Sequence, residues 1–344
     1  MNAKTHWGME KEFTLEDFDY TLPSELIAQE HAIPRDTSRL FVVRQDSLEH
    51  RHFYNIIEYI NPGDVLVINN TRVIPARIFG KKETGGKVEV LLVRKLADGG
   101  WECLLTGRNI KPGAKIIFDK FTAEVSERKE GKYSLYFSTA IEEVMHSGIM
   151  PLPPYIKKKL EDPEMYQTVY SKRKGAIAAP TAGLHFTPEL MQKIRDKGAK
   201  FVEITLHVSL GTFKPVRDIA HHKMDAEFYE VSGEAADEIN SAVKSGHKVF
   251  GVGTTVVKTL ETVSKNGIVY PGSGPSDIFI KPGYEFKSPV YAMITNFHIP
   301  KSTLLMMISA FAGYERVMSA YKIAVDEKYR FYSFGDSMLL YKKE

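Results

Sequence analysis

The chain has 344 residues, of which 43% are hydrophobic and 26% charged, an ordinary composition for a globular protein with room for two domains. Its 46 basic and 43 acidic side chains give a net charge of only +3, so any contact with nucleic acid must come from local patches. The single cysteine, Cys103, excludes an internal disulfide framework and a zinc site built from cysteines.

Two sequence features bear on where the protein resides. Residues 1–20 are charged and lack the apolar centre of a signal peptide. The longest apolar run, Leu304 to Ala312, is too short to cross a bilayer. We therefore expect a cytoplasmic protein, and we expect it to act as a monomer.

The first segment alternates helical and strand patterns. Short elements are predicted at 23–29 (helix) and 40–43 (strand), and residues 53–60 have a helical period. Val65 to Ile68 is a continuous apolar run, typical of a strand buried on both faces. It leads into Asn69-Asn-Thr-Arg72, at the end of a strand where open α/β sheets hold ligands, although an ordinary polar turn is an equal alternative.

The pattern changes after Arg77, where short strand-like runs are separated by glycine-containing turns. No helical period intervenes before Ile141. We predict a small all-β barrel or sandwich, residues 77–149, inserted into an α/β core formed by residues 1–76 and 150–344. The strands predicted within it are 88–93, 101–105, 115–118, 122–126 and 133–137.

A basic stretch follows the predicted insertion. Lys157-Lys-Lys159 and Ser171-Lys-Arg-Lys174 flank three tyrosines, at 155, 166 and 170. Such a surface suits single-stranded RNA, because bases stack on aromatic rings while phosphates contact cations. The alternative is a solvated charged face. The candidate RNA-binding residues are Arg72, Lys157, Lys158, Lys172, Arg173 and Lys174.

The next stretch combines a turn with the start of a helix. Pro180 to Gly183 is predicted as a tight turn, with the glycine supplying a backbone angle that other residues resist. Thr187-Pro-Glu189 is a strong helix start because the hydroxyl caps and proline fits the first helical position. His185 lies just before this helix, whose positive end favours a neutral imidazole. Packing between its apolar neighbours is the alternative.

The rest of the chain repeats strand, polar loop and helix. Strands are predicted at 200–208, 248–253 and 291–295, a helix begins at Ser232, and another begins at Ser302 or Thr303. Three or four loops rich in His, Thr, Asn, Lys and Asp then meet at one edge of a largely parallel or mixed sheet. That convergence indicates an active site better than any single loop does.

Two local patterns in this part match no standard motif. Gly251-Val-Gly-Thr-Thr255 lacks the third glycine of a dinucleotide fingerprint, although amides at the start of a helix are able to hold a polar group. His221, His222, Asp225 and Glu227 match no spacing of metal ligands. We therefore expect no metal.

Eight motifs distributed along the chain are long and distinctive. They are Phe18-Asp-Tyr20, Pro34-Arg-Asp-Thr-Ser-Arg39, Val73-Ile-Pro-Ala-Arg77, Tyr166-Gln-Thr-Val-Tyr170, Ala178-Ala-Pro-Thr-Ala-Gly-Leu-His-Phe-Thr187, Val252-Gly-Thr-Thr255, Thr295-Asn-Phe-His-Ile-Pro-Lys-Ser-Thr-Leu-Leu305 and Tyr329-Arg-Phe-Tyr-Ser-Phe-Gly-Asp336. Through them the chain resembles the S-adenosylmethionine:tRNA ribosyltransferase-isomerase family of queuosine biosynthesis, from about residue 18 to the C-terminus.

The resemblance implies an α/β core with an inserted β-barrel, and transfer of the ribosyl part of S-adenosylmethionine to 7-aminomethyl-7-deazaguanine at the tRNA wobble position. The implied products are epoxyqueuosine-tRNA, adenine and methionine. The chain departs from the family pattern at His222-Lys-Met-Asp225, where the family usually has a second histidine in place of Asp225. That change puts a proton-donor role there in doubt. Lys258 stands where the family favours arginine.

The implied chemistry requires a base of near-neutral pKa, because the sulfonium acidifies the 5′ carbon of the ribose. His185 is the first choice, with His207 and His298 as alternatives, and Asp336 or Glu227 is the expected acceptor for the substrate amine. Lys301 is the expected partner for the methionine carboxylate. The other candidate co-substrate contacts are Thr181, Gly253, Thr254, Thr255, Asn296 and Ser302.

Two other functions stay open at this point. The same surface suits an RNA-binding protein without chemistry, with the β insertion as a recognition module. It also suits an S-adenosylmethionine-dependent RNA methyltransferase. Release of free adenine from S-adenosylmethionine separates the ribosyl transfer from both.

Overall fold

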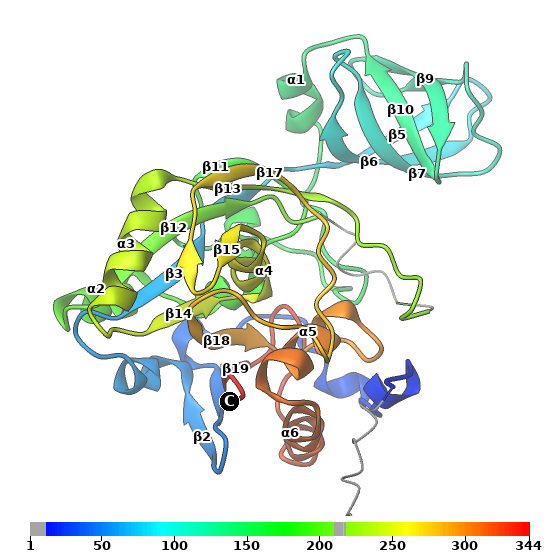
Figure 1. Cartoon of the computed structure of the whole chain (residues 1–344). Helices are drawn as coiled ribbons and strands as arrows, with labels where there is room; N and C mark the ends of the chain where they lie inside the picture. Colours follow the sequence, from blue (N-terminus) through cyan, green and yellow to red (C-terminus); the bar gives the residue numbers. More distant parts are fainter. Residues whose placement is uncertain (1–11, 210–215, 217) are drawn as a thin grey trace, which may run out of the picture.

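Strand β3 (Val65–Asn69) is buried along its whole length and lies in the middle of a nine-stranded mixed sheet, as its continuous apolar run predicts (Figure 1). The structure is a computed structural model that describes residues 12–209, 216 and 218–344. The strands of the sheet, in spatial order, are β17 (Gly272–Ser276), β13 (Glu227–Val231), β12 (Lys200–Leu206), β3, β14 (Val249–Val252), β18 (Val290–Asn296), β19 (Ser337–Tyr341), β1 (Arg39–Val43) and β2 (Leu48–His52).

The four central strands, β12, β3, β14 and β18, are mutually parallel. Their carboxyl ends therefore lie at one edge of the sheet, where the loops that follow them meet. Antiparallel strands complete both sides, since β13 pairs with β12 and β19 pairs with β18. The sheet is mixed, which confirms the predicted α/β class.

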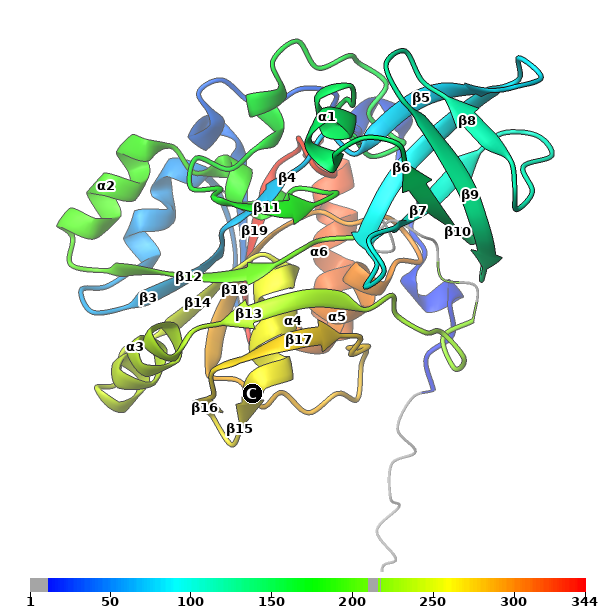
Figure 2. The same cartoon turned by 90° about the horizontal axis from the view of Figure 1, so that it is seen from above.

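Helices cover both faces of the sheet (Figure 2). Side chains of β3 alternate between two apolar clusters, so both faces of the sheet are apolar and need a covering layer. Val65 and Val67 face one cluster, whereas Leu66 and Ile68 face the other. Helix α2 and the 3₁₀ helix η4 pack on the second side. The helices are α2 (Pro188–Asp196), η4 (Phe53–Tyr59), α3 (Gly233–Lys244), α4 (Thr254–Val263), α5 (Thr303–Ala312) and α6 (Tyr314–Asp326).

Six antiparallel strands form the predicted barrel, which is closed and has its own apolar core. Closure pairs every strand edge, so no edge is left to aggregate. Helix α1 (Ile141–His146) follows the barrel and packs Val144 into that core. The strands, in the order around the barrel, are β10 (Lys132–Phe137), β7 (Trp101–Thr106), β6 (Lys87–Lys95), β5 (Arg77–Lys82), β8 (Lys115–Ile117) and β9 (Thr122–Lys129).

The chain enters and leaves the barrel at neighbouring points. The amide of Arg77 donates to the carbonyl of Ile149 at 3.2 Å, and the amide of Ile149 donates back at 2.8 Å. Ile74 and Ile177, outside the barrel strands, contribute to its apolar core. The barrel therefore rests against the larger body, while the domain boundaries at 77 and 149 stay a prediction.

Three local predictions differ from the structure. The helix predicted at 23–29 is a 3₁₀ turn, Ser24–Leu26, because the chain then extends and the amide of Ala28 donates to the carbonyl of Phe331 at 3.3 Å. The helix predicted at 53–60 is η4. The turn at 180–183 is part of the 3₁₀ helix η6 (Thr181–His185), in which a Cβ on Gly183 would lie 1.9 Å from the Tyr170 hydroxyl oxygen. Close approach therefore explains that glycine.

The remaining elements are small. A parallel pair, β4 with β11, joins the segment before the barrel to the basic stretch. None of the helices in the described ranges combines the length and the apolarity needed to cross a membrane. The small elements are η1 (Glu16–Phe18), η3 (Arg35–Thr37), η5 (Pro163–Tyr166), β4 (Thr71–Val73), β11 (Arg173–Ala176), β15 (Ser264–Lys265) and β16 (Ile268–Val269).

Candidate active site

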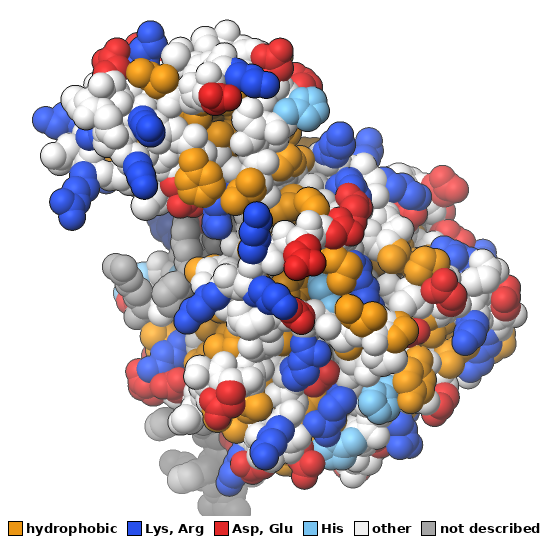
Figure 3. All heavy atoms as spheres, turned by 180° about the vertical axis from the view of Figure 1, so that it is seen from behind, with side chains coloured by type: hydrophobic (Ala, Val, Ile, Leu, Met, Phe, Trp, Pro, Cys, Tyr) orange, Lys and Arg blue, Asp and Glu red, His pale blue; other side chains and the backbone are white. Residues whose placement is uncertain are grey.

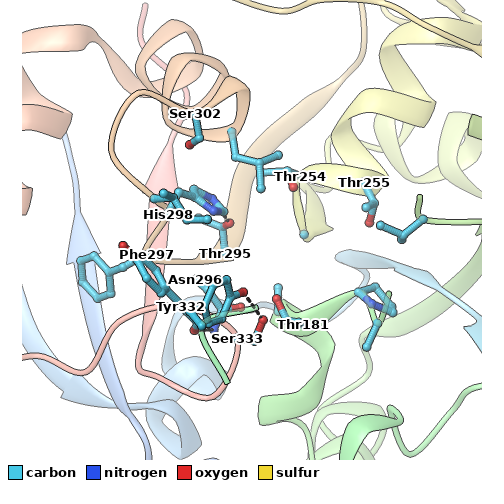
Figure 4. A pocket seen from close by; sticks show the side chains of 18 residues that line it. Thr181, Thr254, Thr255, Thr295, Asn296, Phe297, His298, Ser302, Tyr332 and Ser333 are labelled. Atoms are coloured by element: carbon cyan, nitrogen blue, oxygen red, sulfur yellow. Dashed lines mark hydrogen bonds between the residues drawn. The ribbon is translucent and has the colours of Figure 1, made fainter. Parts of the chain in front are cut away.

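The loops that follow β14 and β18 line a pocket at the carboxyl edge of the parallel strands. Residues 179–182 and the aromatic loop before β19 complete its wall, so the side chains come from segments far apart in sequence (Figure 4). The polar residues that line it are Thr181, Thr254, Thr255, Thr295, Asn296, His298, Ser302 and Ser333. Convergent polar groups in a largely apolar wall are typical of a small-molecule site.

The pocket adjoins a much larger cleft. Its own volume is about 60 Å³, whereas the cleft between the sheet and the barrel measures about 690 Å³. Val208 lines both. Because sites for whole small molecules measure roughly 300–1,000 Å³, the pocket itself holds only part of a ligand, and the cleft has room for the rest.

Gly253 sets the geometry at the start of α4. Its φ of 99° and ψ of 153° lie in a region that is essentially restricted to glycine. Its amide donates to the carbonyl of Ile294 at 2.8 Å, which ties the helix start to β18. Thr254 and Thr255 open the helix beside the pocket, where the positive end of the helix favours a polar or anionic ligand group.

His298 lines the pocket. Its Nε2 lies 2.9 Å from Oγ1 of Thr295, and its backbone amide donates to the hydroxyl of Tyr321 at 2.7 Å. Burial lowers the pKa of His298 to about 3. The ring is therefore neutral at pH 7 and is able to accept a proton or a hydrogen bond.

His185 is buried behind the wall of the pocket and is not among its lining residues. Its Nδ1 lies 2.7 Å from Oγ of Ser38, its Nε2 lies 3.1 Å from Nδ2 of Asn296, and its ring stacks on Phe53. Burial, with smaller effects of nearby cationic side chains, lowers its pKa to about 3. The ring is neutral, as the sequence predicts, but burial is the main cause. Its role as the base stays an untested prediction that this placement does not favour.

The loop before β19 contributes two residues that the sequence analysis did not select, Tyr332 and Ser333. Tyr332 has a φ of 72°, which is strained for a residue with a side chain, and its carbonyl accepts from Nδ2 of Asn296 at 3.1 Å. Ser333 lies 2.7 Å from the hydroxyl of Tyr155, measured between the two oxygens. The aromatic composition of this loop was the available signal, but only Asp336 was predicted from it.

Asp336 stabilises this loop from behind. Its carboxylate accepts from the amides of Arg39 and Arg330, each at 2.8 Å, and burial raises its pKa. Lys301, the predicted carboxylate partner, forms ion pairs with Glu16 at 2.7 Å and Asp19 at 3.0 Å. Neither Asp336 nor Lys301 is among the described residues that line the pocket.

Seven predicted residues do line the pocket together. One of them, Ser302, also caps α5, because its hydroxyl accepts from the amide of Leu305 at 3.2 Å. The set comprises Thr181, Gly253, Thr254, Thr255, Asn296, His298 and Ser302.

His207 and Glu227 line the adjoining cleft. Nδ1 of His207 lies 2.7 Å from Oγ1 of Thr71, and burial lowers the pKa of the ring. Glu227 forms a buried ion pair with Lys258 at 3.0 Å and accepts from the amide of Ser209 at 2.7 Å. These two candidates therefore lie in the neighbouring cleft and not in the pocket.

Asp225, the departure from the family pattern, also lines the cleft. Its carboxylate lies 3.7 Å from Nζ of Lys132, a residue of the barrel. The residue therefore connects the larger body to the barrel across the cleft. The sequence also predicts a loop at 209–213 with a glycine at its centre, of which only Ser209 lies within the described residues.

The predicted RNA-binding residues fall into two groups. Arg72, Lys157, Lys158 and Lys174 line a hollow of about 680 Å³ between α1 and residues 148–163. Lys172 and Arg173 lie outside this hollow and pair with Glu203 and Glu230. Within the hollow, Arg72 and Lys158 also form ion pairs, with Glu164 and Glu30. Lysine and arginine side chains also lie around the junction of barrel and larger body, with hydrophobic side chains between them (Figure 3). Among residues 12–209, 216 and 218–344, no group of three or more His, Cys, Asp or Glu side chains is placed to hold a metal ion.

Comparison with known proteins gives the family of this chain. The family model described as "Queuosine biosynthesis protein" matches residues 15–340. The S-adenosylmethionine:tRNA ribosyltransferase-isomerase of Natranaerobius thermophilus is 52% identical, over 95% of this chain and 99% of the relative, and that of Carboxydothermus hydrogenoformans is 51% identical over the same shares.

A solved structure extends the comparison to the fold. The crystal structure of the S-adenosylmethionine tRNA ribosyltransferase from Thermotoga maritima is 39% identical and matches with a TM-score of 0.56. The match covers 94% of this chain and 99% of that chain. The family model, the relatives and the solved structure each match nearly the whole chain, so the chain belongs to the queuosine biosynthesis protein family.

Proposed function

We propose that this protein is an S-adenosylmethionine:tRNA ribosyltransferase-isomerase. It transfers the ribosyl moiety of S-adenosylmethionine to 7-aminomethyl-7-deazaguanine at the wobble position of tRNA and releases adenine and methionine. The observation that carries the proposal is the 52% identity, over 99% of the relative, to a protein with this name. We also propose that the protein acts in the cytoplasm, where its tRNA substrate is found, and that it acts there as a monomer.

The pocket supplies groups that suit S-adenosylmethionine as a co-substrate. Amides and hydroxyls of Thr254 and Thr255 are placed at a helix start, where they suit the methionine carboxylate or the ribose hydroxyls. His298 is the predicted base candidate that lines the pocket, and we place the sulfonium-activated 5′ carbon beside it. The ring of His298 is neutral at pH 7 and therefore available to accept the proton. Because burial lowers its pKa to about 3, the transfer requires that the bound substrates stabilise the imidazolium that forms.

The cleft and the basic hollow are the proposed RNA contacts. The cleft holds His207 and Glu227, which suit the aminomethyl group of the target base, and it lies between the sheet and the inserted segment 77–149. We therefore expect neutralisation of Lys157 and Lys174 to weaken tRNA binding and to flatten the log–log salt slope by about one unit for each lost phosphate contact. Lys200, which pairs with Glu238, serves as a control outside the hollow.

The test of the proposal is the appearance of free adenine when the protein is incubated with S-adenosylmethionine and a tRNA that carries the precursor base. A methyltransferase would add only a methyl mass to the RNA, and an RNA-binding protein would release nothing. The comparisons favour neither alternative. Substrate-dependent adenine, with the tRNA gaining a ribosyl-derived mass, is the expected result.

A further inference from the structure

Asn296 lines the pocket, and its side chain contains a buried acceptor without a partner among the described residues. Asn296 is only 3% exposed and lines the pocket. Its Nδ2 lies 3.1 Å from the carbonyl oxygen of Tyr332 and 3.1 Å from Nε2 of His185. Its Oδ1 is buried and has no hydrogen-bond partner within the part of the chain that the structure describes. Leaving a buried acceptor unpaired is costly, so the observation points to a donor that arrives with a ligand.

The surroundings fix the orientation of this amide. The carbonyl of Tyr332 only accepts hydrogen bonds, so it requires an N–H donor and excludes the flipped amide, whose Oδ1 would face it. The second N–H then points to Nε2 of His185, which must lack a proton to accept it. In a neutral imidazole the proton consequently lies on Nδ1, which donates to Oγ of Ser38.

We propose that Asn296 accepts a hydrogen bond through Oδ1 from an N–H group of S-adenosylmethionine, and that His185 is a positioning residue for Asn296. The inference rests on the proposed function of the pocket. Two N–H groups of the co-substrate have the required chemistry, the exocyclic amine of adenine and the ammonium of methionine. A carboxylate is excluded at this point, because it would set two acceptors against each other.

The experiment compares S-adenosylmethionine with two analogues. One carries a dimethylated adenine amine and the other lacks the methionine ammonium, so each removes one N–H source. The readout is the ratio of kcat/KM for the co-substrate to that for the analogue, from release of the free base, which is dimethyladenine for the first analogue and adenine otherwise, with the corresponding Kd ratio from calorimetry. We expect the wild-type protein to discriminate against one analogue by roughly 5- to 150-fold, the effect of leaving a buried polar group unpaired.

The variants identify the residue that reads the donor. Asn296→Ala, or Asn296→Ser if the alanine variant folds poorly, should reduce that discrimination to nearly one, and His185→Ala should reduce it because the amide loses its anchor. His50→Ala is a control outside the pocket. His50 is exposed, whereas His185 is buried, but His50 also stacks on a phenylalanine and hydrogen-bonds a hydroxyl, that of Tyr329. This variant should keep the wild-type ratio, because a purely structural loss affects both ligands equally.

The two possible failures are distinguishable. If the wild-type protein releases no adenine from S-adenosylmethionine with substrate tRNA, the proposed function fails. If it releases adenine but discriminates against neither analogue, or if the Asn296 variants keep the wild-type ratio for both, the assignment of Asn296 is overturned. Loss of discrimination against the dimethylated analogue identifies the adenine amine as the donor, and loss against the other identifies the ammonium.

Discussion

The buried ion pair between Lys258 and Glu227 gives a sharp test of the structure. Nζ of Lys258 lies 3.0 Å from Oε2 of Glu227, and the two side chains are 8% and 5% exposed. Lys258→Met keeps most of the apolar stem but leaves the carboxylate buried without its cation. At an effective dielectric constant of 20, the lost attraction is about 5 kcal/mol before solvation is counted. Breaking a buried pair from one side destabilises a protein by roughly 3–5 kcal/mol.

The assay is the free energy of unfolding from urea titration, with an exposed pair as the control. Lys172 and Glu203 have the same chemistry, but their side chains are 63% and 32% exposed. Lys172→Met should therefore cost at most about 1 kcal/mol. Lys258→Arg should retain most of the stability, because the guanidinium keeps the charge. The double variant of Lys258→Met with Glu227→Gln should recover part of the loss, because no buried charge remains.

The reasoning is refuted if Lys258→Met costs no more than Lys172→Met. It is also refuted if the two substitutions are additive, so that the double variant is less stable than Lys258→Met by as much as Glu227→Gln alone destabilises the protein. Either result would mean that Glu227 is hydrated or partnered in a way that makes Lys258 dispensable.

Three further predictions follow from other parts of the fold. Gly253→Ala and Gly313→Ala, at φ values of 99° and 95°, should each lower the free energy of unfolding by roughly 1–3 kcal/mol. Only Gly253→Ala should also lower adenine release, because of the two glycines only Gly253 lines the pocket. Equal turnover in the two variants would contradict this. His185 and His298 have pKa values of about 3 in the folded state and about 6.5 in the unfolded state, so below pH 6.5 the unfolded state binds protons that the folded state does not. As the pH falls from 6 to 4, each histidine should therefore lower the free energy of unfolding by up to about 1.4 kcal/mol per pH unit. In urea titrations over that range, His185→Gln should remove one proton from the pH slope of stability, and an unchanged slope would refute the buried neutral ring. Chelation by EDTA should leave adenine release intact once magnesium needed to fold the tRNA is controlled for, and loss restored only by added zinc would disprove this.

The sequence predicted the central sheet because burial leaves a strong pattern. A strand covered on both faces must be continuously apolar, as β3 is, and short strands between glycine turns indicate the barrel. The caps at Thr187, Ser232 and Ser302 were also predictable, because each hydroxyl accepts from an amide three residues later.

Elements at the edges of the fold were harder to predict. Strand β2 is mostly exposed, so its sequence lacks an alternating apolar pattern, and its pairing with β1 is a tertiary property. Helix α6 follows α5 directly through Gly313, whereas that glycine predicts the end of the apolar helix. Glycine indicates a break there but does not tell whether a second helix follows.

The site could be predicted as a set of loops but not as contacts. The motifs identified Asn296, His298 and Thr254, which the fold brings together from β18 and α4. They did not indicate that the ring of His185 lies behind the wall of the pocket, because its partners Ser38 and Asn296 lie 147 and 111 residues away. The direction of a side chain depends on such distant neighbours, which no local pattern specifies.

The most direct test of the central claim follows two labels through one reaction. S-adenosylmethionine labelled separately in its ribose and in its methyl group is incubated with the protein and the precursor tRNA, and the RNA is then analysed. Ribosyl transfer predicts that the ribose label enters the RNA in a one-to-one ratio with released adenine, while the methyl label leaves with methionine. Methyl label in the RNA, with the ribose label still attached to adenine, would contradict the account.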